Sequence, residues 1–225
     1  MSISIAIDGP AGAGKSTISR KVSAALGYIY VDTGALYRSI ALTLNQQKIA
    51  PEETPKIESA LHNTDIRLEF IDGEQHVFLN DRDVSGEIRT AEVSMLASKY
   101  SARPEVRAYL LSLQRKIAAE HNVIMDGRDI GTVVLPHATL KIFLTADAED
   151  RAQRRYEEML QRGQSADYET VLADIKKRDY DDSHRAIAPL KPAEDAILVN
   201  TTGNTLEQSV KQLSDVILQN LNKGE

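Results

Sequence analysis

A glycine-rich segment near the start of the chain, GPAGAGKST from Gly9 to Thr17, has residue types and a spacing that suit phosphate binding. It follows the apolar run ISIAID, precedes a helical pattern, and matches the phosphate-binding loop through Gly9, Gly14, Lys15 and Ser16. Glycines let successive backbone N–H groups curl around phosphate oxygens, and the following helix adds its positive N-terminal end. The alternative is a chance glycine-rich turn, which would not need a strand before it and a helix after it. We therefore expect this loop to hold a nucleoside triphosphate.

Three side chains of the loop have distinct expected roles. Lys15 reaches the β and γ phosphates, Ser16 offers a hydroxyl to magnesium, and Thr17 lies near the α phosphate. We therefore expect ATP as the phosphate donor, Mg²⁺ as the cofactor, and Ser16 as the protein ligand of the metal. The predicted nucleotide-binding residues are Gly9, Pro10, Ala11, Gly12, Ala13, Gly14, Lys15, Ser16 and Thr17.

Charged segments follow the second and third predicted strands. They are DTGALYR, from Asp32 to Arg38, and DGRD, from Asp126 to Asp129. Ligands of an open parallel sheet bind beyond the carboxyl ends of its strands, so both segments are expected to face the crevice of the phosphate loop. Arg38 can grip a second phosphate bidentately, Asp126 is expected near the metal, and Arg128 and Asp129 face the acceptor. A surface arginine on a helix and a plain turn are the alternatives.

Two groups of arginines occur on predicted helices farther along the chain. Arg151, Arg154 and Arg155 share a helical face at spacings of three and four. One interpretation is a closing lid whose mobile arginines reach the transferring phosphate and exclude water. The alternative is a solvated helix with intrahelical ion pairs. Arg178, Asp182 and Arg185 form a second stripe, open to the same two interpretations.

Together these clusters supply more arginine to one crevice than a single triphosphate requires. The acceptor is therefore expected to be a second phosphorylated ligand, which indicates a small kinase. A GTPase would carry an Asn-Lys-x-Asp motif after a later strand, and the sequence lacks one. A translocating ATPase would be larger. The predicted catalytic residues are Lys15, Asp126, Arg128, Arg151, Arg155 and Arg178.

The elements that position these residues follow an α/β pattern. Nearly continuous apolar runs at 3–7, 28–31, 122–125, 140–144 and 196–199 are typical of parallel strands covered on both faces. Helical periods fill the gaps at about 15–26, 34–47, 103–120, 147–161, 167–182 and 204–222. Right-handed crossovers then give a three-layer α/β/α fold, a doubly wound five-stranded parallel sheet of the P-loop kinase type.

One region departs from this rhythm. Between about 62 and 84, two alternating apolar and polar runs flank Asp72-Gly73, a dipeptide that favours a tight hairpin turn. With helical stretches at about 51–61 and 86–97, it forms an inserted subdomain containing a small antiparallel sheet. We expect one kinase domain over 1–225, with core 1–50 and 101–225, a monophosphate-binding insertion at about 51–100, and a short helical lid at about 148–165.

Composition argues against several other classes of protein. The chain has 225 residues, a formal net charge of −6 and no cysteine, so disulfides and a surface that broadly attracts nucleic acid are not expected. MSISIAID lacks the basic region of a signal peptide, and the apolar runs are too short to span a membrane. We expect a cytoplasmic monomer with no nucleic-acid or membrane partner.

Several blocks of the chain, spread over nearly its whole length, resemble the bacterial cytidylate kinase family, the CMP and dCMP kinases of the nucleoside monophosphate kinase group. The blocks are GPAGAGKST, DTGALYR, VSGEIRTAEVSMLASKYSARPEVR, DGRDIGTVVLP, KIFLTA, RAQRR and IKKRDYDDSHRAIAPL. The resemblance implies a five-stranded P-loop core, an enlarged monophosphate-binding insertion and a short arginine lid. It also implies transfer of a phosphoryl group from ATP to CMP or dCMP.

The resemblance also implies a set of acceptor contacts. Thr33, Tyr37 and Arg38 would contact the monophosphate, whose phosphate is shared with Arg107 and Arg128. Ser98, Arg107 and Asp129 would read cytosine, Asp182 and Arg185 would approach the sugar, and Arg178 would join the lid arginines. The predicted substrate-binding residues are Asp32, Thr33, Tyr37, Arg38, Ser98, Arg107, Arg128, Asp129, Asp182 and Arg185. Thr33 and Ser16 stand where many family members have Ser and Gly, and both keep or add a hydroxyl.

Two other functions remain open from the residues alone. One is a kinase for another monophosphate, such as UMP or AMP. The other is a module that senses nucleotides and binds ATP without transferring phosphate. A sensor has no need of Lys15, Asp126 and the arginine clusters, which provide the positive charge that phosphoryl transfer requires.

Overall fold

The computed structural model describes residues 2–71 and 73–221. The turn predicted at Asp72 and the last residue of the helix predicted to end at 222 lie outside these residues. Five parallel strands form the central sheet: β1 (Ser4–Asp8), β2 (Ile29–Asp32), β6 (Val123–Gly127), β7 (Leu140–Thr145) and β8 (Ile197–Asn200). Their order is β2-β6-β1-β7-β8. The predicted five-stranded parallel sheet is confirmed.

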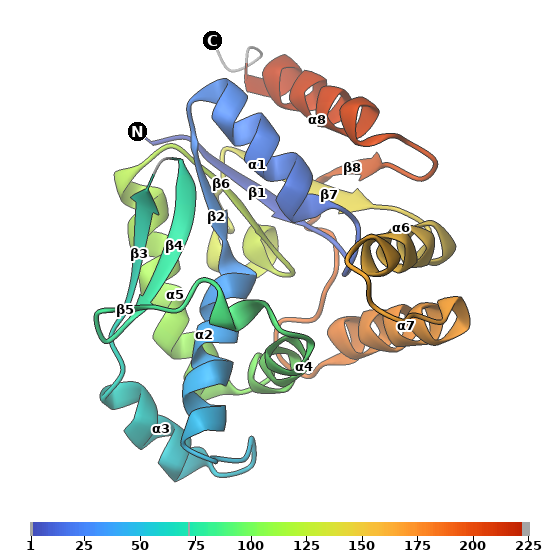
Figure 1. The fold of residues 1–225 in the computed structure, drawn as a ribbon. Helices are drawn as coiled ribbons and strands as arrows, with labels where there is room; N and C mark the ends of the chain where they lie inside the picture. Colours follow the sequence, from blue (N-terminus) through green and yellow to red (C-terminus); the bar gives the residue numbers. More distant parts are fainter. Residues whose placement is uncertain (1, 72, 222–225) are drawn as a thin grey trace.

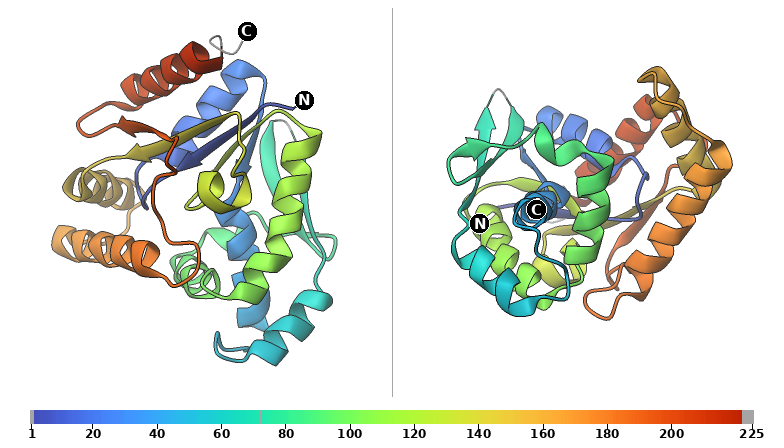
Figure 2. Two further views of the ribbon diagram at one scale, coloured as in Figure 1. Left: turned by 180° about the vertical axis from the view of Figure 1, so that it is seen from behind. Right: turned by 60° about the horizontal axis from the view of Figure 1, so that its bottom comes forward.

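Side chains of β1 alternate between two apolar clusters, one on each face of the sheet. Ile5 and Ile7 are buried with residues of α1 (Lys15–Leu26) and α8 (Leu206–Leu221), whereas Ala6 is buried with residues of α5 (Pro104–Glu120). Figures 1 and 2 show α1 and α8 covering one face, with α5 and the short π-helix η2 (Ile130–Val134) behind the other. The sheet is therefore the middle of three layers, as the sequence predicts.

Helices at the carboxyl ends of the strands carry most of the charged segments. They include α2 (Thr33–Gln46), which begins directly after β2, and the packed pair α6 (Ala148–Gln161) and α7 (Tyr168–His184). A small apolar cluster of Ala152, Val171 and Ile175 joins α6 to α7. None of the helices within residues 2–71 and 73–221 combines the length and the hydropathy that a membrane span requires.

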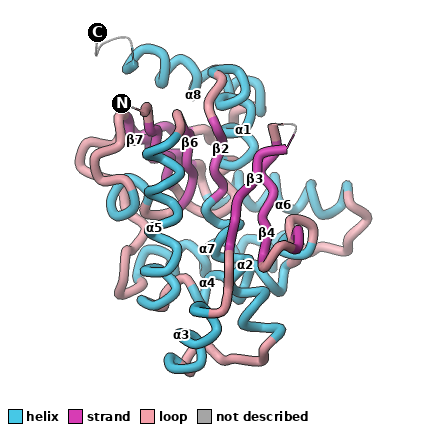
Figure 3. The backbone as a smooth tube through the Cα atoms, turned by 90° about the vertical axis from the view of Figure 1, so that its left-hand side faces the viewer, coloured by secondary structure: helices cyan, strands magenta, loops and turns pink. Residues whose placement is uncertain are grey.

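The departure from the α/β rhythm is an antiparallel sheet inserted between α2 and α5. Its strands are β3 (Ile66–Ile71), β4 (Glu74–Leu79) and β5 (Arg82–Asp83). They are flanked by α3 (Thr54–His62), the 3₁₀ turn η1 (Glu87–Arg89) and α4 (Ala91–Tyr100). Figure 3 shows β3 and β4 beside β2. Ile66, Val77 and Leu79 are buried in one cluster with α2, so the hairpin is attached through an apolar contact.

We expect alanine at Gly9 to disturb the junction between β1 and the phosphate loop. Its Cβ would lie 1.9 Å from the carbonyl oxygen of Leu144, a backbone atom of β7 that cannot move aside easily. Gly27 is a matched control, because its φ of +70° strains an alanine but no atom lies within 4 Å. Left-handed strain alone costs about 1–2 kcal/mol. In urea denaturation, Gly9→Ala should lose roughly 2 kcal/mol more than Gly27→Ala; equal losses would contradict this view.

Candidate active site

A cavity of about 420 Å³ lies beyond the carboxyl ends of β1, β2 and β6. It is walled by the phosphate loop, the start of α2, the end of α4, one face of α5, the segment after β6, and α6 and α7. Of the predicted site residues, the cavity brings together Ala11, Gly12, Ala13, Gly14, Lys15, Ser16, Thr17, Asp32, Thr33, Tyr37, Arg38, Ser98, Arg107, Asp126, Arg128, Asp129, Arg155, Arg178, Asp182 and Arg185. Gly9, Pro10 and Arg151 do not line it.

The ammonium group of Lys15 is held inside the phosphate loop. Its Nζ donates to the carbonyl oxygens of Gly9 at 2.8 Å and Pro10 at 2.7 Å, and the residue is only 6% exposed. Burial, helped by the positive charge of Arg128, lowers the pKa of Lys15 to about 7. Gly9 and Pro10 therefore contribute to the site indirectly, because their carbonyl oxygens orient Lys15.

Ser16 and Asp126 form the oxygen-rich part of the site. Ser16 Oγ donates to Asp126 Oδ2 at 2.8 Å, Tyr30 donates to Oδ1 at 3.2 Å, and Thr33 donates to the main-chain oxygen of Asp126 at 2.7 Å. Burial, with a contribution from the nearby charge of Asp32, raises the pKa of Asp126 to about 6. A hydroxyl and a carboxylate side by side are hard oxygen ligands, so this pair fits Mg²⁺.

Asp32 organises the start of α2. Its Oδ1 accepts from the backbone N–H of Ala35 at 3.0 Å, which caps the helix, and its Oδ2 accepts from Arg38 at 2.7 Å. A Cβ at Gly34 would lie 3.0 Å from both Asp32 Oδ1 and Arg38 Nη1, so a larger residue would crowd this pair. The Nε atom of Arg38 is buried and has no hydrogen-bond partner among the described residues. Arg38 thus retains an unused donor beside the cavity.

Asp129 is the centre of a second ion-pair cluster. Arg107 from α5 pairs with its Oδ2, and Arg185 at the end of α7 pairs with its Oδ1 at 3.1 Å. Arg107 also lies over the ring of Tyr37, 5.7 Å from the centroid. Both Asp129 and Arg107 are buried. The two ion pairs bring α5, the end of α7 and the segment after β6 together at one polar corner of the cavity.

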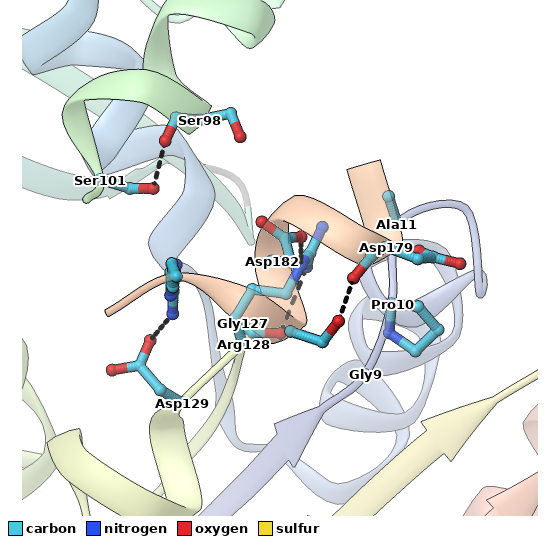
Figure 4. A network of polar contacts seen from close by, with 12 residues as sticks. Gly9, Pro10, Ala11, Ser98, Ser101, Gly127, Arg128, Asp129, Asp179 and Asp182 are labelled. Atoms are coloured by element: carbon cyan, nitrogen blue, oxygen red, sulfur yellow. Dashed lines mark hydrogen bonds and ion pairs between the residues drawn. The ribbon is translucent and has the colours of Figure 1, made fainter. Parts of the chain in front are cut away.

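Arg128 and Asp182 form a further ion pair beside the cavity. Arg128 Nε donates to Asp182 Oδ2 at 2.8 Å, and Figure 4 shows the two side chains facing each other, with Ser98 of α4 across the space from them. Arg178 lines the cavity one turn earlier on α7 and has no ion pair with any described residue. Burial and the charge of Arg128 lower the pKa of Arg178, so its guanidinium lies where an anion would be favourable.

The arginines of α6 point in different directions, which corrects the expectation that they act as one mobile group. Arg151 is buried and bonds to Asp179 at 2.6 and 3.1 Å and to the carbonyl oxygen of Ala11 at 2.8 Å. Arg154 pairs with Asp150 at 2.6 Å, the intrahelical pair of the alternative interpretation. Of the three, only Arg155 lines the cavity. Helical spacing placed the three Cα atoms on one face, but Arg151 and Arg154 bond to different acceptors and neither side chain lines the cavity.

Two buried polar residues of this region were missed in the sequence. Gln114 lines the cavity seven residues after Arg107 on α5, and its Nε2 has no partner among the described residues. The two-turn spacing from Arg107 was the available signal. Asp8, only 4% exposed, accepts from the backbone N–H groups of Ile130 and Gly131, both at 2.8 Å. It thereby ties the start of the phosphate loop to the segment that follows Asp129.

Comparison with known proteins agrees with this geometry. A family model described as Cytidylate kinase matches residues 5–219. A cytidylate kinase of Carboxydothermus hydrogenoformans is 51% identical over 213 residues, covering 95% of this chain and 96% of the relative. One of Caldicellulosiruptor bescii is 50% identical over 214 residues, covering 95% of each chain. One of Leuconostoc mesenteroides is 50% identical over 217 residues, covering 96% of this chain and 97% of the relative.

A more distant likeness extends to the fold alone. The crystal structure of an uncharacterized protein from Eubacterium ventriosum superposes with a TM-score of 0.53 at 12% identity, covering 96% of this chain and 98% of that one. With the parallel sheet and the loop that ends in Lys15 and Ser16, the chain is a P-loop kinase, an enzyme that transfers phosphoryl groups. Within that class, the chain belongs to the cytidylate kinase family.

We expect Asp8 to make the stability of the fold depend on pH. Burial raises its pKa to about 6 from an ordinary value of 3.8, against the opposing effect of its two backbone hydrogen bonds. Between these values the folded chain binds the proton more tightly than the unfolded chain, so ionisation of Asp8 destabilises the fold as pH rises. Relative to Asp8→Asn, the wild-type free energy of unfolding should therefore fall by on the order of 2–3 kcal/mol between pH 4 and 7.

Urea denaturation at a series of pH values measures this difference. A constant difference between the two unfolding free energies from pH 4 to 7 would contradict the prediction. So would a wild type that gains stability relative to Asp8→Asn as the pH rises.

Proposed function

We propose that the chain transfers the γ-phosphoryl group of ATP to CMP and dCMP, giving ADP and CDP or dCDP. The observation that carries the proposal is that one cavity joins the phosphate loop to the cationic and acidic side chains of a second ligand site. Lys15 and Ser16 lie at one part of it, and Arg38, Arg128 and Arg178 lie at another. Family membership supports the same reaction.

The donor site is proposed to hold ATP along the loop from Gly9 to Thr17. Backbone N–H groups and the N-terminal end of α1 would bind the phosphates, with Lys15 at the β and γ positions. Mg²⁺ would be held by Ser16, with Asp126 2.8 Å from its hydroxyl, and would neutralise charge on the donor phosphates. For Lys15, binding means exchanging the carbonyl oxygens of Gly9 and Pro10 for phosphate oxygens.

The acceptor phosphate is proposed to lie between Arg38, Arg128 and Arg178, with Thr33 and Tyr37 beside it. Arg38 and Arg128 are half-buried beside the cavity, where reduced contact with water strengthens their attraction for an anion. An oxygen of the acceptor phosphate attacks the γ-phosphorus in line, and no side chain acts as nucleophile. Arg155, the lid arginine that lines the cavity, and Arg178 would neutralise charge that develops during transfer.

The base is proposed to lie against Asp129, Arg107 and Ser98. Asp129 already accepts from Arg107 and Arg185, but a carboxylate has about four lone-pair sites and retains capacity for the cytosine amino group. Arg107 and Ser98 would donate to the ring nitrogen and carbonyl. Uracil presents a carbonyl where cytosine has the amino group, and this oxygen would face the Asp129 carboxylate, so UMP should be the weaker substrate.

The sugar is proposed to lie near Asp182 and Arg185. The carboxylate of Asp182 is held by Arg128, and the guanidinium of Arg185 is held by Asp129 and by the carbonyl oxygen of Ala188 at 2.6 Å. Both groups are thus fixed without the ligand, which suits recognition of CMP and dCMP alike. Arg151 is proposed as a positioning residue, because it joins the carbonyl of Ala11 in the phosphate loop to Asp179 on α7.

We further propose a single kinase domain over 1–225, with the insertion at about 51–100 binding the monophosphate and 148–165 acting as a lid. The enzyme would work as a cytoplasmic monomer on small-molecule substrates, without a nucleic-acid or membrane partner. The net charge of −6 supports the proposal about nucleic acid. The apolar cluster between α6 and α7 supports a lid in which the two helices move together.

Removing the amine of Lys15 should abolish most turnover. Lys15→Ala takes away the side-chain cation proposed at the transferring phosphate, so we expect kcat with ATP and CMP to fall by roughly 100-fold or more. ADP release by a coupled assay measures it, with CMP, dCMP, UMP and AMP tested in turn on the wild type. CMP and dCMP should be the best acceptors. Unchanged turnover in Lys15→Ala, or preference for AMP, would refute the proposal.

Removing the guanidinium of Arg38 should mainly weaken acceptor binding. A charge-assisted hydrogen bond is worth about 1.5–3 kcal/mol, so Arg38→Ala should weaken CMP binding roughly 10- to 100-fold. The matched control is Arg82→Ala, because Arg82 is exposed on β5 of the insertion and forms a surface ion pair with Glu87. Calorimetric titration with CMP compares the two. Normal CMP affinity in Arg38→Ala would place the phosphate elsewhere.

A further inference from the structure

The side chain of Gln75 completes the edge of the central sheet. Among the strands within residues 2–71 and 73–221, β2 is the edge of the central sheet and pairs with β6, so Asp32 at its end presents its N–H and C=O on the unpaired side. Gln75, on β4 of the insertion, meets both groups. Its Oε1 accepts from Asp32 N at 2.8 Å, and its Nε2 donates to Asp32 O at 3.3 Å. A side-chain amide thus pairs with Asp32 as the peptide group of another strand would.

The residue that Gln75 holds is the one on which Arg38 depends. Asp32 caps α2 through Ala35 and accepts from Arg38 Nη2 at 2.7 Å. This is the only ion pair of Arg38 with a described residue, and its buried Nε has no hydrogen-bond partner among them. The direction of the Arg38 guanidinium is therefore set by the carboxylate of Asp32, whose main chain is fixed on one side by β6 and on the other by Gln75.

The insertion provides a firm support for this contact. Val77 and Leu79 of the same strand are buried against α2, and the N–H of Val77 donates to Ser85 Oγ at 2.9 Å. The neighbouring Glu74 makes only a 3.5 Å ion pair with Arg20, with the two side chains 60% and 42% exposed. Gln75 is thus distinguished from its neighbour by two hydrogen bonds to the main chain of the site.

We propose that Gln75 is a positioning residue for the acceptor phosphate, acting through Asp32 to hold Arg38 at the cavity. The proposal rests on the proposed function, since it assigns Arg38 to the acceptor. Under this proposal the β3–β4 hairpin contributes to acceptor binding, although Gln75 itself does not line the main cavity. The donor site depends on β1 and the phosphate loop, whereas both hydrogen bonds of the Gln75 side chain go to Asp32.

The test uses the full chain and steady-state ADP release. Gln75→Met keeps the length of the side chain and removes both hydrogen bonds. We expect KM for CMP to rise about three- to tenfold, while kcat and KM for ATP stay within about twofold. The matched control, Glu74→Gln, should leave all three constants near those of the wild type. Gln75→Glu should raise KM for CMP at least as much, because a carboxylate oxygen would face the carbonyl of Asp32.

A double-mutant cycle separates positioning from general loosening. In an Arg38→Ala background, Gln75→Met should change KM for CMP by less than about twofold, because its effect passes through Arg38. Full additivity, a parallel loss of ATP affinity, or no effect of Gln75→Met would overturn the proposal. If the wild type prefers another monophosphate, the proposed function fails, and the same cycle measured with that acceptor still decides the role of Gln75.

Discussion

Repulsion between cations gathered around one cavity is the constraint on which the rest of the site depends. Arg38, Arg107, Arg128 and Arg178 line one cavity together with Lys15. Arg107 and Lys15 are buried and Arg38 and Arg128 are half-buried, so these cations would repel one another and destabilise the fold if nothing offset their charge. Carboxylates offset this for most of them: Asp32, Asp129 and Asp182 each pair with one or two arginines. These acids make it possible for the fold to assemble before a phosphorylated ligand arrives.

The order of the strands brings these acids to one place. β2, β6 and β1 are neighbours, with Asp32 opposite Asp126 and Asp8 opposite Gly127. Three neighbouring strand ends therefore deliver the cap of α2, the partner of Ser16 and the support of the segment after Asp129 to the same edge of the sheet. The phosphate loop follows β1, the central one of the five strands, so the proposed donor site lies beside the strand ends that carry the proposed acceptor site.

Much of this arrangement could be predicted from the sequence, because buried parallel strands and a phosphate loop leave strong local patterns. Contacts between elements left no such pattern. Helical spacing grouped Arg151 with Arg155, yet Arg151 pairs with Asp179 on α7, 28 residues away in sequence. Asp8 and Gln75 were missed because their partners are main-chain groups, which every residue possesses. Such pairings depend on strand order and on where the insertion packs, and neither is local.

The two halves of the site hold their cations in different ways, and this difference has a functional consequence. Lys15 is oriented by carbonyl oxygens of its own loop, on the rigid core, so the donor site is organised by local structure. Arg38, Arg128 and Arg185 of the proposed acceptor site are oriented by carboxylates at the end of β2, on α7 and in the segment after β6. An incoming phosphate competes with those carboxylates for the same guanidinium groups. Acceptor binding is therefore coupled directly to the position of α7. The donor site is linked to the same helices through Arg151, which joins the carbonyl oxygen of Ala11 to Asp179, so movement of α6 and α7 acts on both sites.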